Sequence, residues 1–158
     1  MKEIYKAITD VLVNDTDLKG YVDYTSKKVN IRRGFSIDGE WSKLVVFHLQ
    51  GELMATDFSP QIRIVPLLVR VYDRENDLTV DDICERIILL LDGADLDVVD
   101  KLHVFDCSYD GVLIPLSYNE SSKAWEKVLR FALTFRVDSI AGTSGKPVRK
   151  RQIGRQGN

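Results

Sequence analysis

The residue types in this chain that could carry out chemistry are two histidines and two cysteines: His48, His103, Cys84 and Cys107. All four side chains are potential metal ligands. His103 and Cys107 share one face of a predicted strand, where residues four apart lie about 13 Å from each other. They cannot hold one ion together, and the sequence contains no other closely spaced pair of these residues. We therefore expect no metal site.

Motifs for catalysis are equally hard to find. The sequence contains neither the GxSxG nucleophile elbow nor the GxxxxGK[ST] and GxGxxG loops that cradle phosphates. Asp81, Asp82 and Glu85 could support acid chemistry, but carboxylates at the start of a helix usually interact with the helix dipole and with solvent. Cys84 lies on the apolar stripe of a predicted helix and Cys107 in a predicted strand, so both are expected to be buried thiols. We predict a protein that is not an enzyme and needs no cofactor.

The charge of the chain is divided unevenly. The formal net charge is −2, but residues 141–158 hold five basic side chains and no acid, which leaves 17 basic against 24 acidic side chains in residues 1–140. The terminal stretch has four glycines and only Val148 and Ile153 as core formers, so it is predicted to be a flexible tail. An acidic body with a basic tail suits a tail that finds an acidic surface, such as one on a neighbouring copy. The candidate partner-binding residues are Lys146, Arg149, Lys150, Arg151 and Arg155.

Two basic stretches could instead contact nucleic acid. The stretch Arg32-Arg33-Gly34-Phe35 combines cations with an aromatic ring, although solvated arginines at the end of a strand are the favoured interpretation in an acidic body. The tail stretch 149–151 resembles a polybasic arm that binds nucleic acid. An arm that orders on binding a protein is the equal or better interpretation, because a few charges give only weak, salt-sensitive affinity for DNA.

Residues 60–93 are predicted to form the centre of the fold. Their first half, PQIRIVPLLVRVYD, is apolar on both faces at strand spacing, which is typical of a strand in the middle of a sheet. Pro66 has no N–H, so it predicts a bulge or an unpaired position there. The second half, TVDDICERIILLLDG, has apolar residues at helical spacing, with Thr79 as the expected N-cap and Gly93 as the expected stop.

Shorter patterns complete an α+β fold. They predict a helix at residues 2–14, strands at 28–35 and 43–50, and a loop at 51–59. Asp110-Gly111 is the strongest hairpin signal of the chain, between predicted strands at 102–109 and 112–118.

The last predicted strand, residues 125–138, alternates between an apolar and a polar face. It would span roughly 40 Å, so it either bends at a bulge or projects as part of a hairpin arm. We predict one domain over residues 1–140, built from a mixed or mainly antiparallel sheet, two helices packed on one face, and a long hairpin.

The order of these segments resembles the tail terminator (tail completion, head–tail joining) proteins of long-tailed bacteriophages. The resemblance covers most of residues 1–138. It rests on the helix KEIYKAITDVLV, the short DLKGYV segment, the strand ending in VRVYDRE, the helix VDDICERIILLLDG, and a closing strand of the LRFALTFRV type. The basic tail is not part of that pattern.

The resemblance implies a structural virion protein that forms a homo-oligomeric ring, typically a hexamer, in the tail or neck. Such a ring caps the tail tube, stops its polymerisation and offers a joint to the head–tail connector protein. Genomic DNA would pass through the lumen without specific binding. Assembly would take place in the host cytoplasm and without a membrane, since no apolar run approaches the ~20 residues that a membrane span needs. The alternatives are another neck-ring protein (head completion or connector stopper) and a cytosolic nucleic-acid-binding module that uses the basic tail.

Overall fold

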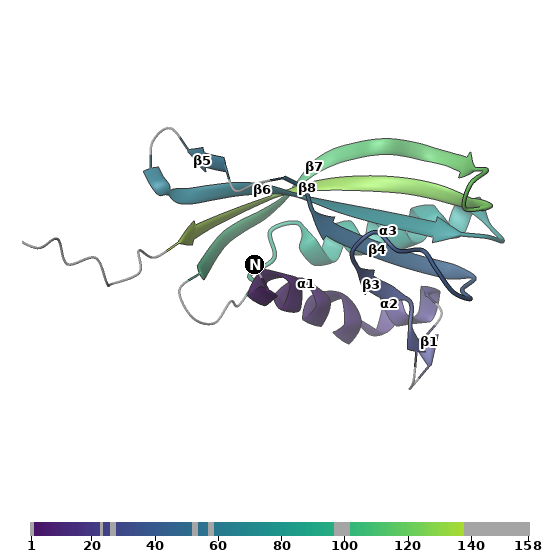
Figure 1. The fold of residues 1–158 in the computed structure, drawn as a ribbon. Coiled ribbons are helices and arrows are strands. Elements are labelled where there is room, and N and C mark those ends of the chain that lie inside the picture. The colour runs from purple at the N-terminus through teal and green to yellow at the C-terminus, as the bar shows by residue number, and fades with distance from the viewer. Residues whose placement is uncertain are drawn as a thin grey trace, which may run out of the picture.

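The computed structural model describes residues 2–22, 24–25, 28–51, 54–56, 59–96 and 102–137. Its helices are α1 (Lys2–Asn14), α2 (Thr16–Tyr21) and α3 (Asp77–Leu91). Its strands are β1 (Tyr24–Thr25), β2 (Lys28–Val29), β3 (Ile31–Arg33), β4 (Lys43–Leu49), β5 (Met54–Thr56), β6 (Ser59–Asp73), β7 (Leu102–Asn119) and β8 (Ala124–Val137). The helices lie on one face of a long curved sheet (Figure 1), which confirms the predicted α+β class. None of the described helices is long and apolar enough to cross a membrane.

The main sheet has the strand order β3-β4-β6-β8-β7, with β5 paired to the early part of β6. Among the described strands of this sheet, the short β3–β4 pair is parallel and the other pairs are antiparallel. The strands β6 and β8 pair without a register shift from Ile62↔Arg136 to Asp73↔Trp125. The central position predicted for the strand that is apolar on both faces is therefore confirmed.

Pro66 interrupts pairing on one side of β6 only. Its carbonyl accepts a hydrogen bond from Gln50 N (2.8 Å), so its missing N–H also points toward the β4 side. The β4 ladder ends at Leu49↔Leu67, and the β5 ladder begins at Met54↔Ile64. The proline lies in the gap between these two ladders, where no N–H is needed. The predicted unpaired position is confirmed, and the pairing with β8 runs through it without a bulge.

The helix α3 begins earlier than predicted. Asp73 Oδ1 accepts from the backbone N–H groups of Glu75 and Asn76, which turns the chain as soon as β6 ends. The Asn76 side chain then caps the helix by accepting from Leu78 N (2.9 Å). The prediction of Thr79 as the N-cap was wrong, because this turn places a better capping group one turn upstream. Gly93, with a φ of +70°, ends the helix as expected.

The predicted hairpin at Asp110-Gly111 was also wrong. The strand β7 runs unbroken through this dipeptide, and its register against β8 shifts between Tyr109 and Gly111. Gly111 has a φ of +107°, which suits a β-bulge as well as a tight turn. The chain reverses instead in the polar stretch 119–123, where Asn119 Oδ1 accepts from the backbone of Ser121 and Ser122.

The strand β8 also differs from its prediction. It neither bulges nor projects, because β6 and β7 pair with it on both sides and the register shifts fall in β7. The predicted loop at 51–59 contains β5, and the predicted strand at 28–35 is divided into β2 and β3. The face of β8 predicted to be polar is covered in part, because Ala124 and Val128 are buried there.

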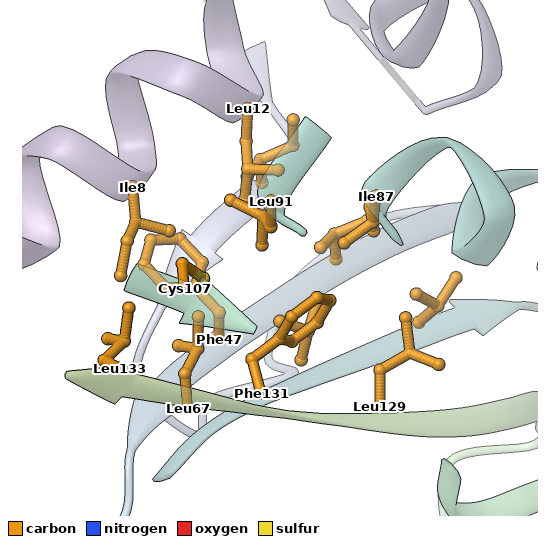
Figure 2. Packing of buried hydrophobic residues seen from close by; sticks show 14 of the residues in the cluster. Ile8, Leu12, Phe47, Leu67, Ile87, Leu91, Cys107, Leu129, Phe131 and Leu133 are labelled. Atoms are coloured by element: carbon orange, nitrogen blue, oxygen red, sulfur yellow. The ribbon is translucent and has the colours of Figure 1, made fainter. Parts of the chain in front are cut away.

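The main core lies between the helices and the face of the sheet that they cover (Figure 2). Ile8 and Leu12 of α1 and Ile87 and Leu91 of α3 point toward the strands, and all four are fully buried. The strand side chains that meet them are Phe47, Leu67, Cys107, Leu129, Phe131 and Leu133. This arrangement confirms the apolar face predicted for the last strand.

Candidate assembly surfaces

A groove with a volume of about 520 Å³ separates α2 from α3, and we call it the α2–α3 groove. Its two walls come from helices that lie far apart in the sequence. The lining residues are Thr16, Asp17, Gly20 and Tyr21 of α2 and Asp82, Glu85, Arg86 and Leu89 of α3.

Asp15 and Arg86 hold the two walls of this groove together. Asp15 caps α2 by accepting from Leu18 N (2.7 Å), and it receives two hydrogen bonds from the Arg86 guanidinium (3.0 and 2.5 Å). Those bonds are the largest cause that lowers the pKa of the Asp15 carboxyl, and the same contact raises the pKa of Arg86. Arg86 also pairs with Asp17 at 3.1 Å. Arg86 is therefore committed to the α2 wall.

The α3 wall carries charge and apolar surface that the described residues leave open. Asp82 and Glu85 are exposed, and neither forms an ion pair with another described residue. Leu89 follows Glu85 by one turn and is 75% exposed. These residues recur at helical spacing, so they line one side of the helix. The groove therefore offers two free carboxylates and an apolar contact in sequence order.

A second groove, with a volume of about 360 Å³, lies beside the N-terminal half of α1, and we call it the α1–β3 groove. The Arg33 guanidinium lies over the Tyr5 ring, 3.9 Å from its centroid, and the Tyr5 hydroxyl accepts from Leu49 N. Lys2 and Lys6 add positive charge, and Glu3 and Thr9 complete the lining. Basic side chains outnumber acidic ones in this groove, whereas acidic side chains outnumber basic ones in the α2–α3 groove.

The stretch Arg32-Arg33-Gly34-Phe35 does not form one patch. Arg32 donates to Asp38 O (2.6 Å) and to Asn30 Oδ1 (2.9 Å), so it supports the 34–42 segment. Arg33 belongs to the α1–β3 groove, and Phe35 is 71% exposed with its ring 3.9 Å from that of His48. The interpretation as solvated arginines is thus only partly right.

The candidate metal ligands lie apart or inside the protein. Cys84 and Cys107 are the buried thiols that were predicted, and burial raises the pKa of each to about 12. His48 is buried on the opposite face of the sheet from the helices, and desolvation lowers its pKa. The side chain of His103 lies outside the described residues. Within the described ranges, no three His, Cys, Asp or Glu side chains gather as a metal site.

The outer edge of β7 is poorly suited to pairing with another chain. Pro115 has no N–H to give, and register shifts interrupt β7 on both sides of Tyr109 and again after Val112. Prolines and bulges on an edge strand discourage sheet-to-sheet addition. The β7 edge therefore offers little for the addition of a further strand.

The tail residues predicted to bind a partner, Lys146, Arg149, Lys150, Arg151 and Arg155, lie outside the described residues. Sequence reasoning missed the α2–α3 groove, since it assigned Asp82 and Glu85 to the helix dipole and solvent. The run of exposed positions 82, 85 and 89 at helical spacing was the available signal.

Comparison with known proteins gives a fold and no family. No family model matches the chain. No curated protein matches it either. Among solved structures, it is similar to a chain in the "Virion of native gene transfer agent (GTA) particle", with a TM-score of 0.67 and 13% sequence identity. The match covers 85% of this chain and 96% of that chain, so the two share a fold across nearly the whole domain.

Proposed function

We propose that this chain is a structural protein of a phage-like virion and that its copies form a ring at the end of the tail tube. The ring caps the tube, stops its polymerisation and provides the joint to the head connector. The observation that carries the proposal is the fold shared with a chain of a gene transfer agent virion, which is matched over 96% of its length. The order of segments that resembles tail terminators gives the finer role.

The distribution of charge supports a ring rather than a two-fold dimer. The acidic α2–α3 groove is lined by α2, which follows α1 in the chain, and the basic α1–β3 groove is lined by residues 2–9 of α1 and by Arg33. Lys6 lies eight residues, about 12 Å, from the end of α1, which is more than the screening length of about 8 Å at physiological salt, so the charges of the two grooves are largely screened from each other. Two unlike surfaces on one subunit favour head-to-tail contacts, which form a ring when the rotation between neighbours closes.

The test is the state of assembly of the full chain. Native mass spectrometry and negative-stain microscopy are expected to detect rings, either free or on the ends of tail tubes from the same phage. Added to polymerising tube protein, the chain is expected to shorten the tubes and to occupy one end of each. A chain that stays monomeric with tubes present and leaves their length distribution unchanged contradicts the proposal. Turnover of a small substrate would contradict its non-catalytic part.

The lumen of such a ring is expected to be acidic, since residues 1–140 carry 24 acidic against 17 basic side chains. Like charge would let DNA slide through without sticking. A ring structure whose lumen is lined by Lys and Arg would contradict this part.

The basic lining of the α1–β3 groove favours a second candidate function, nucleic-acid binding. It brings Lys2, Lys6 and Arg33 together, a combination that suits the phosphate backbone of a nucleic acid. Gel-shift assays at moderate salt can compare the full chain with a Lys2→Glu/Lys6→Glu variant and with a chain lacking residues 141–158. Binding by a monomer that these changes abolish would favour this function over a ring.

A further inference from the structure

The α2–α3 groove has the charge order and length to hold one particular segment of the chain. On its α3 wall the order is acid, acid, apolar: Asp82, Glu85 and Leu89. Seven residues of helix separate the first from the last, which is about 10 Å along the axis. The α2 wall adds Asp17, which is 64% exposed on its side chain, and Tyr21.

The basic tail contains the complementary order. In its stretch VRKRQI, residues 148–153, three consecutive cations follow Val148, and Gln152 separates them from Ile153. In an extended chain, alternate side chains point to opposite sides. Arg149, Arg151 and Ile153 then share one side in the order cation, cation, apolar, and they span about 13 Å. The long arginine side chains can cover the difference of about 3 Å from the α3 wall.

We propose that residues 148–153 of one copy dock in the α2–α3 groove of a neighbouring copy. Arg149 and Arg151 pair with Asp82 and Glu85, and Ile153 packs on Leu89. Lys150 points to the α2 wall, where Asp17 pairs with Arg86 and still has 64% of its side chain exposed. The inference rests on the proposed ring, because the ring supplies the neighbour.

A neighbour fits this role better than the chain's own tail. Lys127 pairs with Asp81 near the start of α3, and Tyr109, the partner of Phe131 in the sheet, donates to Asp92 at its end. The middle of α3 therefore lies opposite residue 129, about 26 Å before the end of β8. Ten residues of an unstructured chain have a mean end-to-end distance of only about 17 Å, and residues 138–147 are the ten that connect β8 to this segment. Docking in the same copy would need that connection to be stretched.

Cysteine cross-linking of full chains tests the contact directly. A Leu89→Cys chain is mixed with a tagged Ile153→Cys chain under mild oxidation, and a covalent dimer of the two chains is expected. Leu78→Cys is the matched control, because Leu78 is a 69% exposed leucine on the same helix that does not line the groove. The native thiols do not compete, since both are buried and have pKa values raised to about 12.

Charge reversal gives a second readout in the same assay. Arg149→Glu/Arg151→Glu in the tagged chain is expected to lower the yield of dimer about ten-fold, the effect of two surface pairs lost and replaced by repulsion. Asp82→Lys/Glu85→Lys in the partner chain is expected to restore it. Equal yields at positions 78 and 89 would overturn the proposal. So would a cross-link that forms only within one chain of a Leu89→Cys/Ile153→Cys double variant.

The failure of this contact can be told apart from the failure of the proposed function. Rings that form and cap tubes without preferential cross-linking at position 89 would remove the docking proposal and leave the function standing. Chains that form no ring under any condition would remove the function itself.

Discussion

Asp15 offers a quantitative test of how α2 is attached to α3. Its carboxylate performs two tasks, since it caps α2 through Leu18 N and holds the Arg86 guanidinium with two hydrogen bonds. Asparagine caps a helix about as well as aspartate, whereas alanine does not. Asp15→Asn therefore removes the ion pair alone, and Asp15→Ala removes both interactions.

The expected losses follow from these contacts. The cap contributes about 1 kcal/mol. Hydrogen bonds to charged groups typically contribute about 1.5–3 kcal/mol to stability. We expect about 1 kcal/mol from this pair, because 30% of the Arg86 side chain is exposed to water. We expect Asp15→Asn to lower the free energy of unfolding by about 1 kcal/mol and Asp15→Ala by about 2 kcal/mol. In a domain of this size the Tm values should fall by about 2–4 and 4–8 °C.

The stabilisation by Asp15 is expected to depend on pH. The folded-state pKa of Asp15 is lowered, chiefly by the hydrogen bonds from Arg86, so the stabilisation is fully present above its ordinary value of 3.8. It is lost as the pH falls through the lower folded value. The difference in stability between wild type and Asp15→Asn should be constant from pH 7 to pH 5 and should shrink below pH 4.

Urea unfolding of both variants from pH 3 to pH 7 measures these differences. Asp10→Asn is the control, since it removes the same charge from an exposed position on α1. If the Asp15→Asn variant is as stable as the Asp10→Asn variant at neutral pH, the inference that the Asp15–Arg86 ion pair holds α2 against α3 is refuted. A difference that persists unchanged to pH 3 would show that the carboxylate charge is not its source.

Three further outcomes test the fold. Phe131→Ala, in the centre of the core, should cost about 3–5 kcal/mol in urea unfolding, whereas the same change at the exposed Phe35 should cost less than about 1. Gly111→Ala should destabilise the protein by about 1–2 kcal/mol because the φ of Gly111 is +107°, whereas Gly20→Ala inside α2 should stabilise it by about 0.5–1 kcal/mol. A Cβ atom has open space at both positions, so equal effects of the two substitutions would contradict the bulge at Gly111. Removal of residues 141–158 should leave the melting transition in place and weaken assembly, and its loss would mean that the tail belongs to the core.

Much of the fold could be predicted from local pattern. The bounds of α1, the stripe of α3 and the buried face of β8 agree with the sequence prediction, because burial of one face imposes a fixed period on neighbouring residues. The unpaired position at Pro66 follows equally directly, since a missing N–H is a property of the residue itself.

Tertiary structure decided the features whose partners lie far away in the chain. Asp110-Gly111 is compatible with a turn or a bulge, and only the pairing of β7 with β8 on both sides of the dipeptide selects the bulge. The α2–α3 groove likewise depends on a contact between Asp15 and Arg86, which are 71 residues apart. The pattern of residues around a position reports whether it is buried and in which element, but two side chains distant in sequence meet only through the packing of the elements that carry them.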